Sequence, residues 1–218
     1  MIGKKLKHTK IAMDKTCFIF DLDGTLIDSF HDIFLSMNLA LEACGVSPLS
    51  NLEAKQLIGP DLATSLDPYL KDSGYTYNQF IQFYREYYEK SSTKSTRLFD
   101  GVIDFLDELK SKSIQCSVLT NKPEIQAKKI LNILKVDNYF DMIIGPDTFN
   151  KAKPDPIGIF KILETYGKTK QEAVMIGDTD VDIQTAKNAN IYSVYITQGY
   201  GSRNELSLSN PDLIINNF

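Results

Sequence analysis

The stretch Phe20-Asp21-Leu22-Asp23-Gly24-Thr25-Leu26 decides the fold that we expect for this chain. It continues an apolar run and places two acids at positions i and i+2, where side chains project to the same side of an extended backbone. Gly24 then allows a sharp turn. A turn explains Asp23 and Gly24, because Asp-Gly is common in turns, but it does not explain Asp21 at the end of a buried strand. The pattern therefore predicts a strand whose carboxyl end carries chemistry.

A second acidic cluster follows a second apolar run. Asp178, Asp180 and Asp182 come directly after Val174-Met175-Ile176-Gly177. Acids at the start of a helix cap it and complement its dipole, which explains Asp180, but three acids in five residues exceed that need. Hard cations such as Mg²⁺ prefer carboxylate oxygens. The cluster therefore predicts a metal site.

The wider sequence alternates short apolar runs with helical patterns. Continuous apolar runs of this length are typical of buried parallel strands. Strand–helix alternation indicates an α/β fold, a Rossmann-like parallel sheet with helices on both faces. The expected strands are Thr16–Leu22, Ile114–Thr120, Asp141–Ile144, Ala173–Ile176, Ile191–Ile196 and Asp212–Ile215.

The region between the first two expected strands breaks this alternation. An apolar stripe at helical spacing runs from Phe30 to Leu41, Ser50-x-x-Glu53 is a capping-box signature, and an aromatic-faced helix covers Phe80–Tyr88. These helices predict a small α-helical domain inserted into the sheet domain, with their aromatic face packing inside it. The boundaries that we expect are a flexible leader at 1–15, a core domain at 16–28 and 97–218, and a helical insert at 29–96. The polar run 91–96 is expected to be the returning linker.

Composition excludes several classes of protein. The 218 residues carry 24 Lys and Arg against 28 Asp and Glu, and the net charge of −4 argues against a nucleic-acid partner. No apolar run approaches the length of a membrane helix. Two histidines are too few for a His-rich zinc site, and neither lies in a context that suggests a Ser-His-Asp hydrolase. Three cysteines without CxxC spacing favour a reducing, cytoplasmic setting. The sequence does not indicate an oligomeric state, and a monomer is the default expectation.

Polar residues also follow two further expected strands. Thr120-Asn121 ends one strand, and Lys153-Pro154 lies in the loop after another. Ligands of open α/β sheets bind beyond the carboxyl ends of the strands, so one pocket can hold all of these groups together with the acids.

The charges in such a pocket require a cation. Asp21, Asp23, Asp178 and Asp182 together carry −4. Two like charges 4 Å apart repel by about 4 kcal/mol at an effective dielectric constant near 20. One Mg²⁺ and Lys153 supply +3, and we expect a proton on Asp23 to remove the rest.

These residues, in this order, resemble the motifs of the haloacid dehalogenase superfamily of phosphohydrolases. The resemblance extends over residues 16 to 218, and the insert looks like the helical cap of its first cap class. The segment 194–206, with Gly199-Tyr200-Gly201, is similar to the phosphoglycolate-phosphatase-like branch. The matching motifs are Asp21-x-Asp23-Gly24-Thr25, Thr120-Asn121, Lys153-Pro154 and Gly177-Asp178-Thr179-x-x-Asp182.

The resemblance implies a role for each motif residue. Asp21 would be the nucleophile that forms an aspartyl-phosphate, and Asp23 the general acid and base. Mg²⁺ would bind the Asp21 carboxylate, the Asp23 backbone carbonyl and Asp178. Residues with supporting roles would be Thr120, Asn121 and Lys153 on the phosphoryl oxygens, Asp182 through the water shell of the metal, and Thr25 in the motif loop.

The expected activity is therefore Mg²⁺-dependent hydrolysis of a small phosphorylated metabolite such as phosphoglycolate. A phosphomutase of the same superfamily is the nearest alternative, although Ile58-Gly59-Pro60-Asp61-Leu62 lacks the Arg usual in mutase caps. A pyrophosphatase or a 5′-nucleotidase ranks lower, as do a metal-free dehalogenase and a receiver-like signalling module. Substrate choice is expected to lie in two cap loops, which contain Gly45, Val46 and Ser47, and Gly59 and Pro60.

Overall fold

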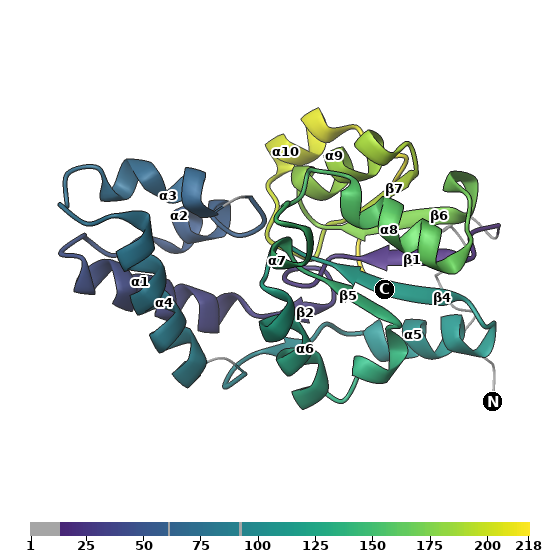
Figure 1. Cartoon of the computed structure of the whole chain (residues 1–218), viewed down its shortest axis with the longest axis horizontal. Coiled ribbons are helices and arrows are strands. Elements are labelled where there is room, and N and C mark those ends of the chain that lie inside the picture. Colours follow the sequence, from purple (N-terminus) through teal and green to yellow (C-terminus); the bar gives the residue numbers. More distant parts are fainter. Residues whose placement is uncertain (1–13, 61, 92) are drawn as a thin grey trace.

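The computed structural model describes residues 14–60, 62–91 and 93–218. It consists of a larger sheet domain and a smaller all-helical part beside it (Figure 1). The leader expected at 1–15 lies outside the described residues up to position 13. At its end, the side chain of Lys15 is largely buried, donates a hydrogen bond to the carbonyl of Gln171 and lies over the ring of Tyr192.

In the part of the chain that the structure describes, the sheet of the larger domain has six strands, and all neighbouring pairs are parallel. The order across it is β5-β4-β1-β6-β7-β8, so β1 lies centrally between β4 and β6. A strand is confirmed at every predicted position. Most strand ends lie one or two residues inside the predicted ends, whereas β6 extends one residue further, to Gly177. The strands are β1 (Cys17–Phe20), β4 (Gln115–Leu119), β5 (Met142–Ile144), β6 (Ala173–Gly177), β7 (Tyr192–Ile196) and β8 (Leu213–Ile215).

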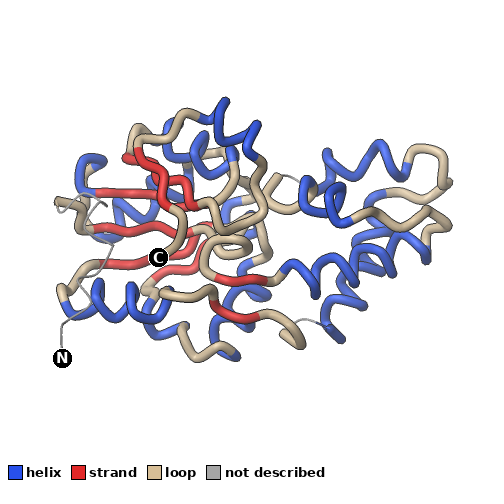
Figure 2. The backbone as a smooth tube through the Cα atoms, turned by 180° about the vertical axis from the view of Figure 1, so that it is seen from behind, coloured by secondary structure: helices blue, strands red, loops and turns tan. Residues whose placement is uncertain are grey.

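Helices cover both faces of this sheet, as predicted (Figure 2). Successive residues of a strand point to opposite faces, so Phe18 and Phe20 pack in one buried cluster and Cys17 and Ile19 in the other. The first cluster takes in α5 (Val102–Ser111) and α6 (Glu124–Ile133), and the second α8 (Ile157–Tyr166) and α9 (Asp180–Ala189). Shorter elements complete the domain: α7 (Pro146–Phe149), α10 (Arg203–Ser209), and 3-10 turns at Asp137–Tyr139 and Lys170–Glu172.

The described residues of the smaller part form four helices, of which the sequence predicts three. The capping box is present, since Ser50 and Glu53 exchange hydrogen bonds at the start of the second helix. The third helix was not predicted, because Pro68 interrupts its pattern and only Leu66 and Leu70 of it are buried. The helices are α1 (Phe30–Ala43), α2 (Asn51–Gln56), α3 (Leu62–Leu70) and α4 (Tyr77–Ser91).

Two strands that the sequence did not reveal join the two parts. β2 (Ile27–Asp28) and β3 (Arg97–Leu98) form an antiparallel pair at the junction (Figure 2). Two residues are too few to show an alternating pattern. The pairing is reinforced by an ion pair of 2.6 Å between Arg97 Nη2 and Asp28 Oδ2.

The run 91–96 was expected to be a linker. Its described residues are held in place by a buried acid of α1. The carboxylate of Asp32 in α1 accepts hydrogen bonds from the backbone N–H groups of Ser95 and Thr96 and from the Thr96 hydroxyl, at 2.7 to 3.2 Å. Ser91 Oγ lies 2.7 Å from Ser36 Oγ. The return to the sheet domain is therefore fixed to α1, which a polar sequence alone does not indicate.

Within the described residues, none of the helices is both long and apolar enough to cross a bilayer. The three cysteines are free and buried, and burial raises the pKa of Cys17 and Cys116 to about 12.

Candidate active site

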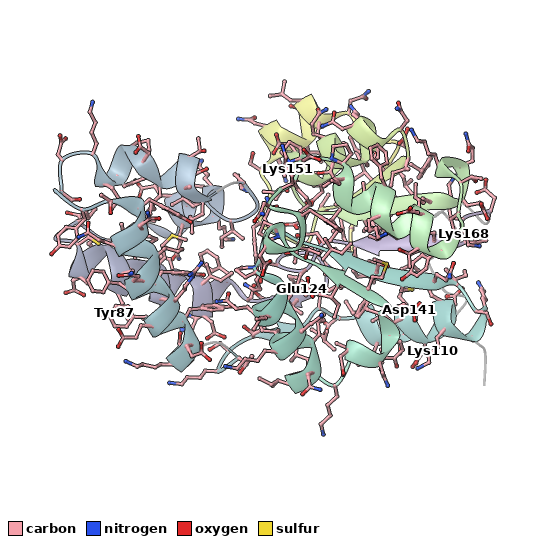
Figure 3. All side chains as sticks on the ribbon, in the orientation of Figure 1. Tyr87, Lys110, Glu124, Asp141, Lys151 and Lys168 are labelled. Atoms are coloured by element: carbon pink, nitrogen blue, oxygen red, sulfur yellow. The ribbon has the colours of Figure 1, made fainter. Side chains whose placement is uncertain are left out.

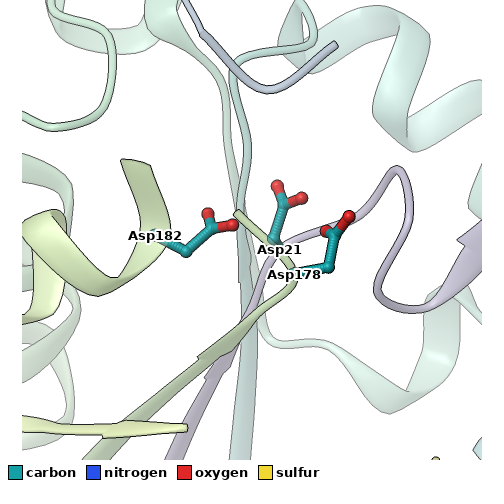
Figure 4. A group of neighbouring side chains, drawn as sticks. All are labelled: Asp21, Asp178 and Asp182. Atoms are coloured by element: carbon teal, nitrogen blue, oxygen red, sulfur yellow. The ribbon is translucent and has the colours of Figure 1, made fainter. Parts of the chain in front are cut away.

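Three buried carboxylates meet at the carboxyl edge of the sheet. Asp21 follows β1, Asp178 follows β6, and Asp182 lies in the first turn of α9; one oxygen from each lies within 4.8 Å of the others (Figure 4). The register of the strands explains why Asp21 and Asp178 lie close together. Phe20 of β1 pairs with Ile176 of β6, so the two strands end side by side and the acids follow at the same edge. The two strands thus bring Asp21 and Asp178 together, the first turn of α9 adds Asp182, and Asp180 is exposed and outside this group.

Lys153 joins two of these acids. Its Nζ lies 2.6 Å from Asp21 Oδ1 and 2.6 Å from Asp182 Oδ1, and all three side chains are almost completely buried. The other oxygen of Asp182 accepts from the N–H and hydroxyl of Thr179, which closes a capping box at the start of α9. Asp182 therefore fixes both the lysine and the helix.

Asp178 is held by the two loops beside it. It accepts a hydrogen bond of 2.9 Å from the Thr25 hydroxyl and one of 2.7 Å from the N–H of Tyr200. A Cβ placed on Gly24 or on Gly199 would lie 2.2 Å from Asp178 Oδ2. Both positions require glycine, because the backbone approaches this carboxylate too closely for any side chain.

In the described part of the chain, the three buried carboxylates have only Lys153 between them, so the cluster carries excess negative charge when all of its acids are ionised. Burial, joined by the charges of Asp182 and Asp23, raises the pKa of Asp21 to about 7 against the attraction of Lys153. Burial and the neighbouring acids also raise the pKa of Asp178 well above its usual range. A set of donors made only of carboxylate oxygens fits Mg²⁺, whose charge would favour the ionised forms.

Asp23 has a cationic partner that the sequence analysis missed. The buried Lys122 places its Nζ 3.0 Å from Asp23 Oδ2, while the Ser29 hydroxyl donates to Asp23 Oδ1. Burial alone would lower the pKa of Lys122, but Asp23, Tyr88 and Tyr84 together outweigh burial and raise that pKa well above its usual value. The charge count made from the sequence left out this lysine, so the buried positive charges beside the four acids are Lys153 and Lys122.

Lys122 also contacts the helical part. Its ammonium lies 4.7 Å from the centre of the Tyr88 ring in α4. The one available signal for Lys122 was its position directly after Thr120-Asn121. Ser29 and Tyr200, also missed, belong to the same surroundings, since the N–H of Ser29 donates to Tyr200 Oη at 2.7 Å.

Thr120 and Asn121 lie at the end of β4, as predicted. The Thr120 hydroxyl accepts from the N–H of Lys122 at 3.1 Å. Asn121 Oδ1 accepts from the N–H of Lys153 at 2.8 Å, and its Nδ2 donates to the carbonyl of Gly59 at 2.8 Å. Asn121 therefore ties the catalytic edge of the sheet to a loop of the helical part.

A cavity of about 240 Å³ lies between the two parts. Gly59 and Pro60 line it, but Gly45, Val46 and Ser47 are not among the described residues that do so, and the space beside Gly45 is open. Figure 3 shows the two sides of the boundary, with Tyr87 on α4 and Glu124 at the start of α6. The lining residues from the sheet domain include Asp21, Asp23, Thr120, Asn121, Lys122 and Lys153.

One face of α4 supplies much of the opposite wall. Tyr77, Ile81, Tyr84 and Arg85 all line the cavity. The aromatic pattern was expected to pack within the helical part, and Phe80 does so, but the face contributes to the cavity as well. A parallel sheet with acids and lysines at its carboxyl edge, facing a helical insert across a cavity, defines a class of α/β enzymes that bind their ligands at that edge.

Comparison with known proteins agrees with this class. The family model for haloacid dehalogenase-like hydrolases matches residues 18–196. A phosphoglycolate phosphatase of Aquifex aeolicus is 34% identical over 201 residues, which cover 90% of this chain and 93% of that protein. A protein of Caldanaerobacter subterraneus, named provisionally as a pyrophosphatase, is 31% identical over 93% of this chain and 91% of its own length.

A solved structure agrees as well. A haloacid dehalogenase-like family hydrolase from Streptococcus pneumoniae superimposes with a TM-score of 0.83 at 28% identity, covering 94% of this chain and 95% of that one. The chain belongs to the haloacid dehalogenase-like hydrolase family. It is a phosphatase-type enzyme of that family, similar to phosphoglycolate phosphatases.

Proposed function

We propose that this protein is a Mg²⁺-dependent phosphomonoester hydrolase that acts through an aspartyl-phosphate on a small phosphorylated metabolite such as phosphoglycolate. The observation that carries the proposal is the position of Asp21, which lines the cavity while Lys153 contacts it at 2.6 Å. The domain boundaries given above are part of the proposal, with residues 29–96 acting as the cap.

In the first step an oxygen of Asp21 attacks phosphorus, and the bond from phosphorus to the leaving oxygen breaks. Asp23 gives a proton to that oxygen, which leaves as an alcohol. Lys153, Thr120 and Asn121 hold the phosphoryl oxygens, whose negative charge a buried ammonium stabilises strongly.

In the second step water attacks phosphorus and the bond to Asp21 breaks, which releases phosphate. Asp23 takes the proton from the water, a step that requires its carboxylate form. Lys122 and the Ser29 hydroxyl hold this side chain in place, because each donates to one oxygen of Asp23.

Asp21, Asp178 and the backbone carbonyl of Asp23 would hold Mg²⁺, with Asp182 acting through the water shell. When bound, the ion supplies positive charge that keeps two anions, the carboxylate and the phosphoryl group, close together. Thr25 orients Asp178 for this role through its hydrogen bond.

The decisive experiment combines one variant with a panel of substrates. Asp21→Asn should fold normally and lose all turnover, since an amide cannot act as the nucleophile; undiminished turnover would contradict the assignment. Wild-type protein with Mg²⁺ should release phosphate from phosphoglycolate. Preferential cleavage of pyrophosphate, as in the name of the Caldanaerobacter relative, or formation of an isomeric sugar phosphate would instead support the alternative activities.

A further inference from the structure

We propose that Arg85 in cap helix α4 binds the carboxylate of the substrate across the cavity from Asp21. This inference rests on the proposed phosphatase function and deepens it. It makes Arg85 a specificity-determining residue.

The leaving group of a substrate faces the helical part. Asp21 and Lys153 line the cavity from the sheet domain, so a phosphoryl group beside them leaves the rest of the substrate next to the residues of the opposite wall.

The composition of the cap wall defines the chemistry of that leaving group. Among the described cap residues that line the cavity, Arg85 is the single charged one, and the others are mostly apolar. Ile33, Ile81 and Leu62 are apolar, and Tyr77 and Tyr84 are polar but uncharged. A short carbon chain that ends in an anion matches an apolar wall with one cation.

Arg85 is available for such an anion. Both acids nearest to it in α4 are engaged elsewhere, since Glu86 lies 2.6 Å from Lys90 and Glu89 lies 2.5 Å from Lys129. Arg85 itself forms no ion pair with any described residue. A guanidinium also matches a carboxylate with two parallel hydrogen bonds, which a lysine cannot provide.

The other cations at the cavity have partners already. Lys153 bridges Asp21 and Asp182, and Lys122 contacts Asp23. These lysines lie at the phosphoryl end. A second anion at the cap end of the substrate would therefore meet Arg85.

The experiment compares two substrates that differ only at the proposed contact, 2-phosphoglycolate and its neutral analogue 2-hydroxyethyl phosphate. The Arg85→Gln variant should lose about 10- to 100-fold in kcat/KM for 2-phosphoglycolate, mainly through KM, because a charged hydrogen-bonded pair contributes about 1.5–3 kcal/mol. For the neutral analogue it should change by less than about threefold. Arg85→Lys should restore part of the preference. Lys90→Gln, which removes an equal charge from the same helix outside the cavity, should change neither substrate.

The remaining outcomes separate the two proposals. If wild-type protein hydrolyses both substrates and Arg85→Gln lowers them equally or not at all, Arg85 does not read a carboxylate, while the phosphatase function stands. Faster wild-type hydrolysis of 2-hydroxyethyl phosphate or phenyl phosphate than of 2-phosphoglycolate overturns the inference in the same way. If wild-type protein with Mg²⁺ hydrolyses none of these esters, the proposed function fails and the inference fails with it.

Discussion

At the scale of single residues, the site depends on how buried charges are paired. An ion removed from water is costly unless a partner of opposite charge lies close to it. Asp21 and Asp182 share Lys153, and Asp23 has Lys122. Each lysine thus offsets the cost of burying the negative charge of its acids and also fixes the position of their side chains.

Lys122 gives the first prediction at this scale. Lys122→Met keeps the length of the side chain but removes the charge that holds Asp23, so kcat/KM for alkyl phosphates should fall by about 100-fold or more, the range of general acid–base catalysis. The loss should be smaller for p-nitrophenyl phosphate, whose leaving group needs no proton. Steady-state kinetics on both substrates measures the difference.

Two control variants accompany this test. Lys122→Arg retains the charge and should recover part of the activity, and Lys129→Met changes an exposed lysine and should be silent. Equal losses for both kinds of substrate in Lys122→Met would show that Lys122 does not act through the acid role of Asp23.

At the scale of elements, the cap is attached through the pair β2–β3 and the carboxylate of Asp32. Asp32 lies in α1, yet its carboxylate accepts three hydrogen bonds from residues that lead into β3. Three donors inside the structure lose their acceptor if this carboxylate is removed. Each buried unsatisfied donor costs free energy.

We therefore expect Asp32→Ala to lower the free energy of unfolding by about 3 kcal/mol. Urea denaturation at neutral pH measures this change. Asp67→Ala, an exposed position in α3, serves as the matched control and should alter stability by less than about 0.5 kcal/mol. A loss in Asp32→Ala no larger than that of the control would contradict the role of this contact.

The contact of the cap with the sheet domain yields another prediction. Gly59 has φ +107°, and a Cβ added there would lie 2.8 Å from Thr179 Cγ2, whereas Gly45 has φ +69° and open space around it. Both Gly→Ala variants should lose about 1 kcal/mol of stability from backbone strain. Only Gly59→Ala should also lower kcat/KM, because it pushes the cap away from Asn121.

Enzyme kinetics on the two glycine variants decides this point. A strong effect of Gly45→Ala on substrate preference would instead support the loop 45–47 as the site of specificity, as the sequence suggested.

At the scale of the whole molecule, the acid cluster couples stability to protons and to metal. The folded-state pKa of Asp21 is raised to about 7, above its unfolded value. A carboxyl group whose pKa is raised in this way stabilises the fold when protonated. In metal-free protein this contribution is fully present below about pH 4 and is lost as the pH rises toward 7.

Mg²⁺ should reverse that trend. The ion binds the ionised carboxylates, so it competes with protons, and the increase in Tm on adding Mg²⁺ should be larger at pH 8 than at pH 5. Ligand at about 100 times its Kd adds about 2.7 kcal/mol to the stability. Thermal unfolding with EDTA or Mg²⁺ at both pH values measures this, and an increase that is the same at both would contradict coupling through these acids.

The sequence by itself determined the strands, their parallel arrangement and most helices, since buried parallel strands need continuous apolar runs and helices need a regular stripe. It also indicated Asp21, Asp23 and Asp178, because a turn or a helix cap does not explain all the acids directly after these buried strands. Lys153 was indicated by its place in the loop after another expected strand. It could not reveal α3, whose pattern Pro68 interrupts, nor the two-residue strands β2 and β3.

Only the tertiary structure decided which groups meet across the boundary of the two parts. Lys122 beside Asp23, Asp32 on the returning chain and Arg85 on the cavity wall each depend on contacts between elements far apart in the sequence. The spacing of apolar and polar residues along a helix shows which face is buried, but it does not show which residue of another element that face contacts. The physical reason is that pairing of charges depends on distances in space, which local periodicity does not encode.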